Sequence, residues 1–187
     1  MLHFGGADKD DVFYDLGCGA GQLCIIAVEE FDVRRAVGID YHRGRVRKAR
    51  ARVRGLGLEE RIKIRSAYFQ DSNLKPATIA YCGVQELSDS LDILQRRLAP
   101  GCRLVTLNLP LVSVIPDKTE YPFYMMITPF KRTKSVDDWA SRVLMRKGTF
   151  EELVDELKRD PDWHTDIRAL RQLVTIRFLE DETVRHP

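Results

Sequence analysis

The sequence predicts an α/β fold in which helices cover both faces of a largely parallel sheet. A short apolar run over residues 12–16 ends in a loop with glycines at alternate positions, and residues 23–30 then carry apolar side chains at helical spacing. A second apolar run over 36–40 closes on an acidic residue and is followed by another helical pattern. Strands that alternate with helices of this length indicate a parallel, doubly wound sheet.

The glycine loop has the form Asp15-x-Gly17-x-Gly19-x-Gly21 and lies between a predicted strand and a predicted helix. Glycines allow a sharp turn with positive φ and let a ligand approach the main chain. The helix that follows offers free N–H groups and a positive dipole end to an anionic ligand group. A dinucleotide fingerprint would need glycine where Gln22 stands, and no Gly-Lys-Ser/Thr sequence ends the loop, so neither a dinucleotide site nor a P-loop is indicated.

This pattern resembles motif I of the class I S-adenosylmethionine (SAM) methyltransferases. The resemblance implies SAM as the cofactor, with the loop carrying its methionine part and Asp15 orienting its amino group. Asp40 ends the second predicted strand, 25 residues later, and is suited to binding two ribose hydroxyls. The cofactor-binding residues expected on this basis are Asp15, Gly17, Gly19, Gly21, Gln22, Asp40, Tyr41, Ala67 and Tyr68.

Length and composition restrict the remaining possibilities. A chain of 187 residues with 44% hydrophobic and 31% charged residues suits one globular domain, expected to span 1–187. The formal net charge of +2 by itself indicates no polyanionic partner. The four cysteines form no Cys-x-x-Cys pair and the four histidines are scattered, so we expect a cytoplasmic protein with reduced cysteines and no metal site. No apolar run reaches the length of a membrane span.

Residues 43–54 predict a strongly basic helix. Seven of these twelve residues are Lys or Arg, while Val46, Ala49 and Val53 keep the spacing expected of a side that faces the core. The charges fit either a solvated helix or a surface for nucleic acid or an acidic protein.

The third predicted strand, 61–65, lacks the acid that the resemblance places after it. Methyltransferases of this class usually carry an Asp there that meets the adenine amino group, whereas this chain has Ala67. We expect the adenine to be held by backbone groups and by stacking on Tyr68 or Phe69, or by Asp71.

The methyl acceptor is expected beyond the fourth predicted strand, 77–82, because doubly wound sheets bind ligands outside the carboxyl ends of their strands. The polar candidates for catalysis there are Tyr81, Gln85 and Glu86. For Tyr81 the alternative is a half-buried strand residue.

A helix over 88–98 leads into the segment 98–105, Leu-Ala-Pro-Gly-Cys-Arg-Leu-Val, which resembles the turn into the fifth strand of the same family. The next segment, 110–148, is expected to be an insertion that caps the acceptor site, with simple cover of the sheet edge as the alternative. A final helix and a strand pair within 163–179 would complete a Rossmann-like, doubly wound, seven-stranded sheet with an antiparallel last strand. The aromatic residues expected to wall a substrate channel are Tyr124, Phe130 and Trp139.

Residues 11–22, Asp-Val-Phe-Tyr-Asp-Leu-Gly-Cys-Gly-Ala-Gly-Gln, resemble more closely motif I of the non-SET histone-lysine methyltransferases of the disruptor-of-telomeric-silencing type. They are equally similar to small archaeal relatives that methylate lysines on many proteins. This resemblance implies a protein lysine as the acceptor. It departs after the fourth strand, where Cys82-Gly-Val-Gln-Glu86 replaces an asparagine-aromatic motif. An RNA acceptor, a small-molecule acceptor or a non-catalytic SAM-binding module are the alternatives.

Overall fold

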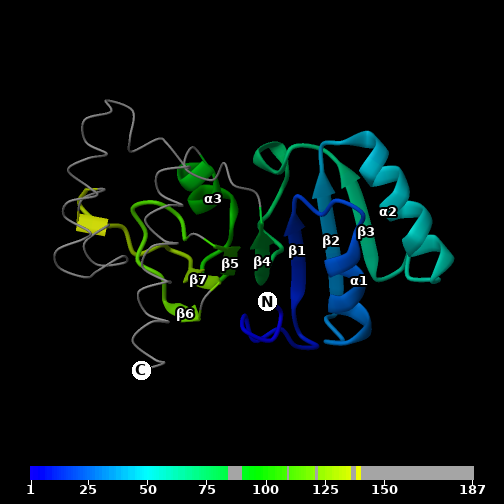
Figure 1. The fold of residues 1–187 in the computed structure, drawn as a ribbon, viewed down its shortest axis with the longest axis horizontal. Coiled ribbons are helices and arrows are strands. Elements are labelled where there is room, and N and C mark those ends of the chain that lie inside the picture. Colours follow the sequence, from blue (N-terminus) through cyan, green and yellow to red (C-terminus); the bar gives the residue numbers. More distant parts are fainter. Residues whose placement is uncertain (84–89, 109, 121, 136–137, 140–187) are drawn as a thin grey trace, which may run out of the picture.

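The structure, a computed structural model, describes residues 1–83, 90–108, 110–120, 122–135 and 138–139 (Figure 1). The helices in these ranges are α1 (Gln22–Glu29), α2 (Arg43–Gly55), α3 (Leu91–Arg97) and the short 3-10 helix η1 (Phe69–Asp71). The strands are β1 (Val12–Leu16), β2 (Arg35–Asp40), β3 (Ile62–Ser66), β4 (Ile79–Cys82), β5 (Arg103–Leu107), β6 (Lys118–Glu120) and β7 (Phe123–Ile127).

The seven strands form one sheet in the order β3-β2-β1-β4-β5-β7-β6. The strands β3, β2, β1, β4 and β5 pair in parallel, whereas β7 runs antiparallel to β5, and β6 antiparallel to β7. The carboxyl ends of the parallel strands therefore meet along one edge of the sheet, at the top of Figure 1. The predicted fold class, a doubly wound seven-stranded sheet with an antiparallel end, is confirmed.

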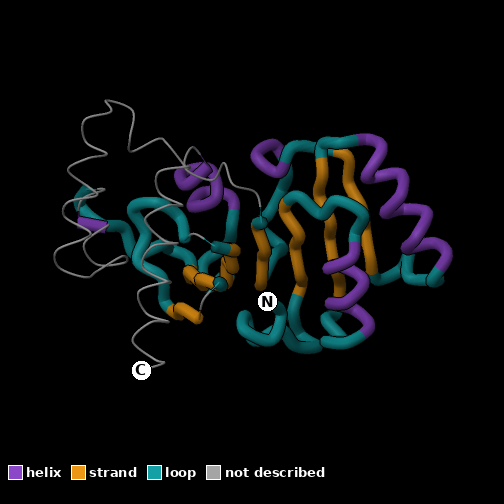
Figure 2. Tube along the Cα trace, in the orientation of Figure 1, coloured by secondary structure: helices purple, strands orange, loops and turns teal. Residues whose placement is uncertain are grey.

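Each face of the sheet buries its own apolar cluster because side chains alternate along a strand. On one face Phe13 of β1 packs with buried residues of α1 and α2, such as Ile25 and Val53. On the other face Tyr14 and Leu16 of β1 pack with residues of α3 and β7. Helices thus lie on both faces, and Figure 2 shows the loops after β1, β2 and β3 along the upper edge of the sheet.

The position of the last two strands differs from the prediction. Strands β6 and β7 lie within 118–127, inside the segment 110–148 that was expected to be an insertion. Residues of β7 alternate between buried and half-buried positions, so one side of the strand joins the core. The strand pair predicted within 163–179 lies outside the described residues. That the remainder of 110–148 caps the acceptor site stays a prediction.

The first residues of the chain pack against the sheet. The side chains of Leu2 and Phe4 are buried, and Lys118 of β6 lies over the Phe4 ring, 4.5 Å from its centroid. The Arg103 guanidinium donates hydrogen bonds to the carbonyls of Gly5 and Gly6, at 2.9 and 2.6 Å. This segment therefore belongs to the folded sheet. No helix in the described ranges is long and apolar enough to cross a membrane.

Candidate cofactor site

The glycine loop turns sharply between β1 and α1 and is tied to the end of β2. Gly17, Gly19 and Gly21 all have positive φ, at 98°, 53° and 77°. Two successive N–H groups, those of Gly17 and Cys18, donate to the carbonyl of Ile39 at 2.8 and 3.0 Å. Since residues with a Cβ rarely adopt such angles, the alternating glycines are the local cause of this turn.

Helix α1 begins at the end of this loop with no side chain capping its N-terminus. Gly21 is the N-cap residue in a left-handed conformation, and the first turn contains no acidic residue. The first N–H groups of a helix have no partner within the helix, and they favour a negative charge. The arrangement fits an anionic ligand group, such as the carboxylate of a methionine part.

Asp40 links the loop to the start of α2. One carboxylate oxygen, Oδ2, accepts from the Gly19 N–H at 2.9 Å, and the other, Oδ1, accepts from the His42 N–H at 2.7 Å. The side chain is buried at the carboxyl end of β2. A carboxylate has about four acceptor positions, so Asp40 retains capacity for two further hydroxyl donors. The geometry fits the binding of a ribose diol.

Asp15 is a buried carboxylate that lacks hydrogen-bond donors. Only 2% of this residue is exposed, and no described residue donates a hydrogen bond to its side chain. Burial, with the charge of Asp40 as a smaller cause, raises the pKa of Asp15 to about 7. A buried charge is stable only when it is paired, and a ligand ammonium group beside Asp15 would provide that pairing. This unsatisfied acid fits the amino group of SAM.

The adenine side of the predicted site contains an exposed aromatic pair. Tyr41 follows β2 and Tyr68 follows β3, and their rings stack with centroids 5.3 Å apart and planes inclined by 10°. Both rings are exposed, at 60% and 58%. Ala67 precedes Tyr68, and its N–H donates to the Asp40 carbonyl at 3.2 Å. Asp71, the alternative contact for adenine, is exposed within η1.

Tyr81 lies beside Asp15. It pairs in register with Asp15 across β1 and β4, so both side chains point to the same face of the sheet. Burial, followed by the charges of Asp15 and Cys82, raises the pKa of the Tyr81 phenol. Gln85 and Glu86 lie outside the described residues, and the catalytic role of all three stays a prediction.

The three aromatic residues expected to wall a channel have packing roles in the described part of the chain. Tyr124 of β7 and Phe130 are each 6% exposed, and Phe130 belongs to the core cluster beneath α3. Trp139 is fully buried, and its Nε1–H donates to the Val114 carbonyl at 2.8 Å. Packing in the core is enough to explain why aromatic residues stand at these three positions, so their assignment to a substrate channel stays a prediction.

Sequence reasoning missed three residues that shape the site. A Cβ added at Gly38 would lie 2.8 Å from the Cys18 sulfur and 2.8 Å from the Ile64 side chain, so β2 requires glycine there. Burial raises the pKa of the Cys18 thiol to about 12, with smaller contributions from Asp15 and Asp40. His42 is the N-cap of α2, where its Nδ1 accepts from the Arg45 N–H at 3.3 Å. Of these three, only His42 could have been predicted from local sequence, because it stands directly before a helical pattern, at the position of an N-cap residue.

The described ranges contain no group of three or more side chains suited to holding a metal ion. The glycine loop, the uncapped N-terminus of α1 and the two acids together offer partners for the carboxylate, the amino group and the ribose of SAM. With this fold and this site, the protein is a SAM-dependent methyltransferase.

Comparison with known proteins agrees with that class. Residues 7–115 match the family described as a methyltransferase domain, and the chain belongs to this family. A protein-lysine N-methyltransferase of Saccharolobus islandicus (strain REY15A) is 33% identical over 110 residues, which cover 57% of this chain and 67% of that relative.

Two solved structures extend the likeness to the fold. An RNA methyltransferase from Salinibacter ruber in complex with S-adenosyl-L-homocysteine superposes with a TM-score of 0.66 at 26% identity, covering 73% of this chain and 92% of that one. A geranyl diphosphate C-methyltransferase from Streptomyces coelicolor A3(2) superposes with a TM-score of 0.50 at 25% identity, covering 56% and 41%. SAM is therefore the cofactor of this enzyme, and its acceptor is a separate question.

Proposed function

We propose that this methyltransferase transfers the methyl group of SAM to the amino group of a protein lysine. The observation that carries the proposal is the likeness to the Saccharolobus protein-lysine N-methyltransferase, at 33% identity over 110 residues. The resemblance of residues 11–22 to motif I of protein-lysine methyltransferases supports the same acceptor.

Binding of the cofactor is assigned to the edge where β1, β2 and β3 end. In this proposal Asp15 pairs with the amino group of SAM, the N-terminus of α1 faces its carboxylate, and Asp40 accepts from the ribose hydroxyls. Tyr41 and Tyr68 provide aromatic surface for the adenine, in place of the acid that Ala67 replaces. SAM supplies the methyl group on a sulfonium centre, so the protein contributes mainly position and exclusion of water.

The acceptor lysine has to arrive as a neutral amine. Its ordinary pKa is about 10.4, and desolvation near the active site lowers the pKa of an amine. Tyr81, which lies beside Asp15 at the end of β4, is the described polar side chain best placed to contact the incoming amine. No dedicated general base is required, and the rate is expected to rise with pH as the neutral amine becomes more populated.

The acceptor is tested with tritium-labelled SAM and the protein fraction of a cell lysate. The matched control is the same fraction after chemical acetylation of its lysines, and an Asp40→Ala variant controls for the enzyme. We expect protease-sensitive label that acid hydrolysis identifies as methyl-lysine, and its loss after acetylation. Equal labelling of native and acetylated protein would contradict the lysine acceptor.

RNA is the second candidate acceptor. It is favoured by the likeness to the Salinibacter RNA methyltransferase, of which this chain covers 92%. The basic helix α2 provides charge of the sign that an RNA substrate needs. Label that nuclease removes and protease leaves, in a lysate that contains RNA, would assign the acceptor to RNA.

A further inference from the structure

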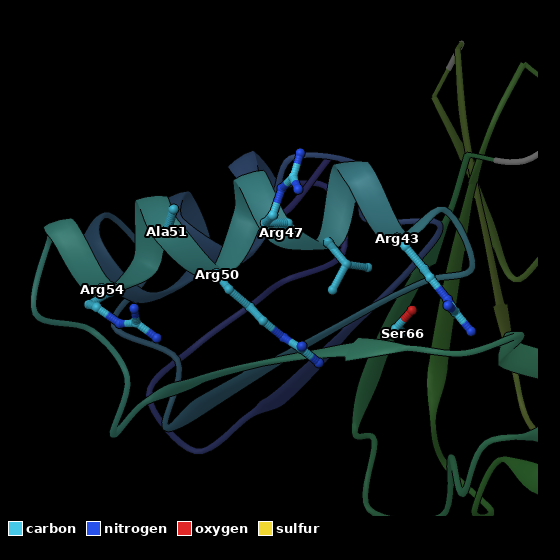
Figure 3. A pocket seen from close by; sticks show the side chains of 7 residues that line it. Arg43, Arg47, Arg50, Ala51, Arg54 and Ser66 are labelled. Carbon is cyan, nitrogen blue, oxygen red and sulfur yellow. The ribbon is translucent and has the colours of Figure 1, made fainter.

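A basic groove lies between α2 and the edge strand β3. It has a volume of about 490 Å³, and four arginines of one helix flank line it together with Ser66 at the end of β3. Figure 3 shows Arg43 and Arg50 extending from the helix toward this strand, while Arg47 extends away from it. The arginines recur at intervals of three and four residues, which places them in one row along the helix: Arg43, Arg47, Arg50 and Arg54.

The positive charge of this row is almost uncompensated. No described carboxylate forms an ion pair with Arg43, Arg47 or Arg50, and α2 itself contains no acidic residue. Arg54 approaches the Glu59 carboxylate only at 3.8 Å, with both side chains exposed. Arg50 donates from Nε to the Ile64 carbonyl at 3.0 Å, a contact that anchors its guanidinium beside β3 and leaves four other N–H donors.

A second basic pocket lies on the opposite face of the same strand. It measures about 450 Å³, and Lys63 and Arg65 of β3 line it with Arg34 and Arg35. Both pockets therefore flank β3, which is an edge strand of the described sheet. Residues 32–66 contain twelve Lys and Arg but only four Asp and Glu, in a chain whose net charge is +2. Positive charge is concentrated at this edge.

We propose that the groove between α2 and β3 binds the sugar–phosphate backbone of single-stranded RNA. Side chains three or four positions apart on a helix are spaced by about 5–6 Å, so the row offers successive donors to successive phosphates. Guanidinium groups bind phosphate oxygens through paired N–H donors. A flexible single strand can enter a groove of this size, whereas a duplex is a wide, stiff rod.

An acidic protein segment fits the groove less well. Peptide grooves hold their ligands with apolar pockets for anchoring side chains as well as with charge. The apolar residues in the lining are Val46, which is buried in the core, and Ala51, which is small, and the remaining apolar surface belongs to the methylene stems of the arginines. Regular charge without anchoring pockets favours a ligand that is itself regularly charged.

The inference is independent of the acceptor proposed above, because it concerns binding without methyl transfer. The test measures fluorescence anisotropy of a labelled single-stranded RNA of 20 nucleotides, without SAM, over a series of salt concentrations. The groove variant is R47Q/R54Q, and the matched control is R45Q/R52Q. Each variant replaces two exposed arginines of α2 that lie seven positions from each other. Arg45 and Arg52, unlike Arg47 and Arg54, do not line the groove.

We expect R47Q/R54Q to weaken RNA binding at least tenfold and the control to change it less than threefold. The slope of log K against log salt is negative, and each lost phosphate contact reduces its magnitude by about 0.7 for a single strand, so the groove variant should reduce the magnitude by about 1.4. Circular dichroism verifies that both variants remain folded.

Three outcomes would overturn the proposal. Equal weakening by both variants would mean that the general charge of α2, rather than the groove, attracts RNA. If the wild-type chain showed no salt-dependent binding of RNA, RNA would not be the ligand of this groove. Tighter binding of a poly-glutamate peptide of equal charge, with the same dependence on Arg47 and Arg54, would assign the groove to an acidic protein.

Discussion

Asp15 and Asp40 are both buried acids, yet their surroundings give them different properties. Asp40 is held by two backbone N–H groups, those of Gly19 and His42. Asp15 has no such donors in the described structure, and burial raises its pKa to about 7. The free protein therefore holds an acid whose charge is fully stabilised only when a cation binds. This difference leads to a pH-dependent prediction for cofactor binding.

SAM should bind more tightly at pH 8 than at pH 6, because Asp15 has to lose its proton before it can pair with the cofactor's amino group. The affinity should rise through pH 7, and an Asp15→Asn variant should bind weakly at both pH values. Isothermal titration calorimetry in two buffers of different ionisation enthalpy measures the affinity and the number of protons released. An unchanged affinity in Asp15→Asn would mean that Asp15 does not contact the cofactor.

The same variant should stabilise the free protein at high pH. The pKa of Asp15 in the folded protein, about 7, exceeds the reference value of 3.8. Between these two pH values the folded state therefore binds more protons than the unfolded state. The free energy of unfolding consequently falls as the pH rises from about 4 to 7. Asp15→Asn should raise the free energy of unfolding at pH 8 by up to about 4 kcal/mol, and less at pH 4. Urea denaturation at both pH values measures this. Asp40→Asn is the contrasting control, since it should destabilise by disturbing two hydrogen bonds.

Gly38→Ala should disturb both stability and cofactor binding. The added methyl group would lie 2.8 Å from Cys18 in the loop and 2.8 Å from Ile64. Overpacking of this kind costs about 1–3 kcal/mol. Gly55→Ala is the matched control because a Cβ there meets nothing within 4 Å. It should be neutral, or stabilising by up to about 1 kcal/mol. Thermal unfolding and SAM titration of both variants measure these effects. Equal losses in the two variants would mean that any Gly→Ala change is harmful and that the close packing around Gly38 is not the cause.

At the scale of elements, one network joins the amino-terminal ends of three strands. Asp11 precedes β1, Thr78 precedes β4, and Arg103 begins β5. The Thr78 hydroxyl donates to Asp11 at 2.6 Å, and the Arg103 guanidinium pairs with the same carboxylate. Burial alone would raise the pKa of Asp11, but these hydrogen bonds lower it. The stability from this acid is therefore present above its reference pKa of 3.8 and is lost as the pH falls further.

Arg103→Met should destabilise the protein by about 2–3 kcal/mol, because it leaves a buried carboxylate without its cation. The first seven residues should also exchange amide hydrogens faster, since Arg103 holds the Gly5 and Gly6 carbonyls. Arg132→Met is the control, as Arg132 pairs with Asp92 at 3.0 Å on the surface. It should cost less than about 0.5 kcal/mol. Similar losses in both variants would contradict a special role for the Arg103 network.

At the scale of the whole molecule, cofactor binding and stability should be linked. The proposed SAM contacts come from loops that connect β1 to α1, β2 to α2 and β3 to η1, so binding should hold several elements together. The charge of the molecule is uneven as well, because residues 32–66, which include α2 and β3, hold eight more Lys and Arg than Asp and Glu, whereas the whole chain holds only two more. Cofactor and polyanion are thus expected to bind at neighbouring places, the cofactor beyond the carboxyl ends of β1, β2 and β3 and the polyanion between α2 and β3.

SAM at one hundred times its dissociation constant should stabilise the fold by about 2.7 kcal/mol. For a protein of this size the melting temperature should rise by about 5–10 °C. Differential scanning fluorimetry with wild type and Asp40→Ala measures the effect, and the variant should show little shift at the same SAM concentration. An equal shift in the variant would place the cofactor away from Asp40.

Sequence patterns alone predicted the alternation of strands and helices, the glycine loop with its two acids and the bounds of α1 and α2 to within about two residues. These features are local or periodic, so short stretches of chain contain their signals. The fold class, a doubly wound seven-stranded sheet with an antiparallel last strand, was expected from the same signals together with the resemblance to the methyltransferases, whereas the order of the strands comes from the structure.

The contacts between residues far apart in the chain became known from the folded structure. The placement of β6 and β7 within 118–127, the stack of Tyr41 on Tyr68 and the pairing of Asp11 with Arg103 depend on contacts between segments far apart in the chain. No periodicity encodes such contacts, because they arise when strands take their order in the sheet. The groove along the α2 arginines is of the same kind, since Ser66 at the end of β3 lines it together with the helix.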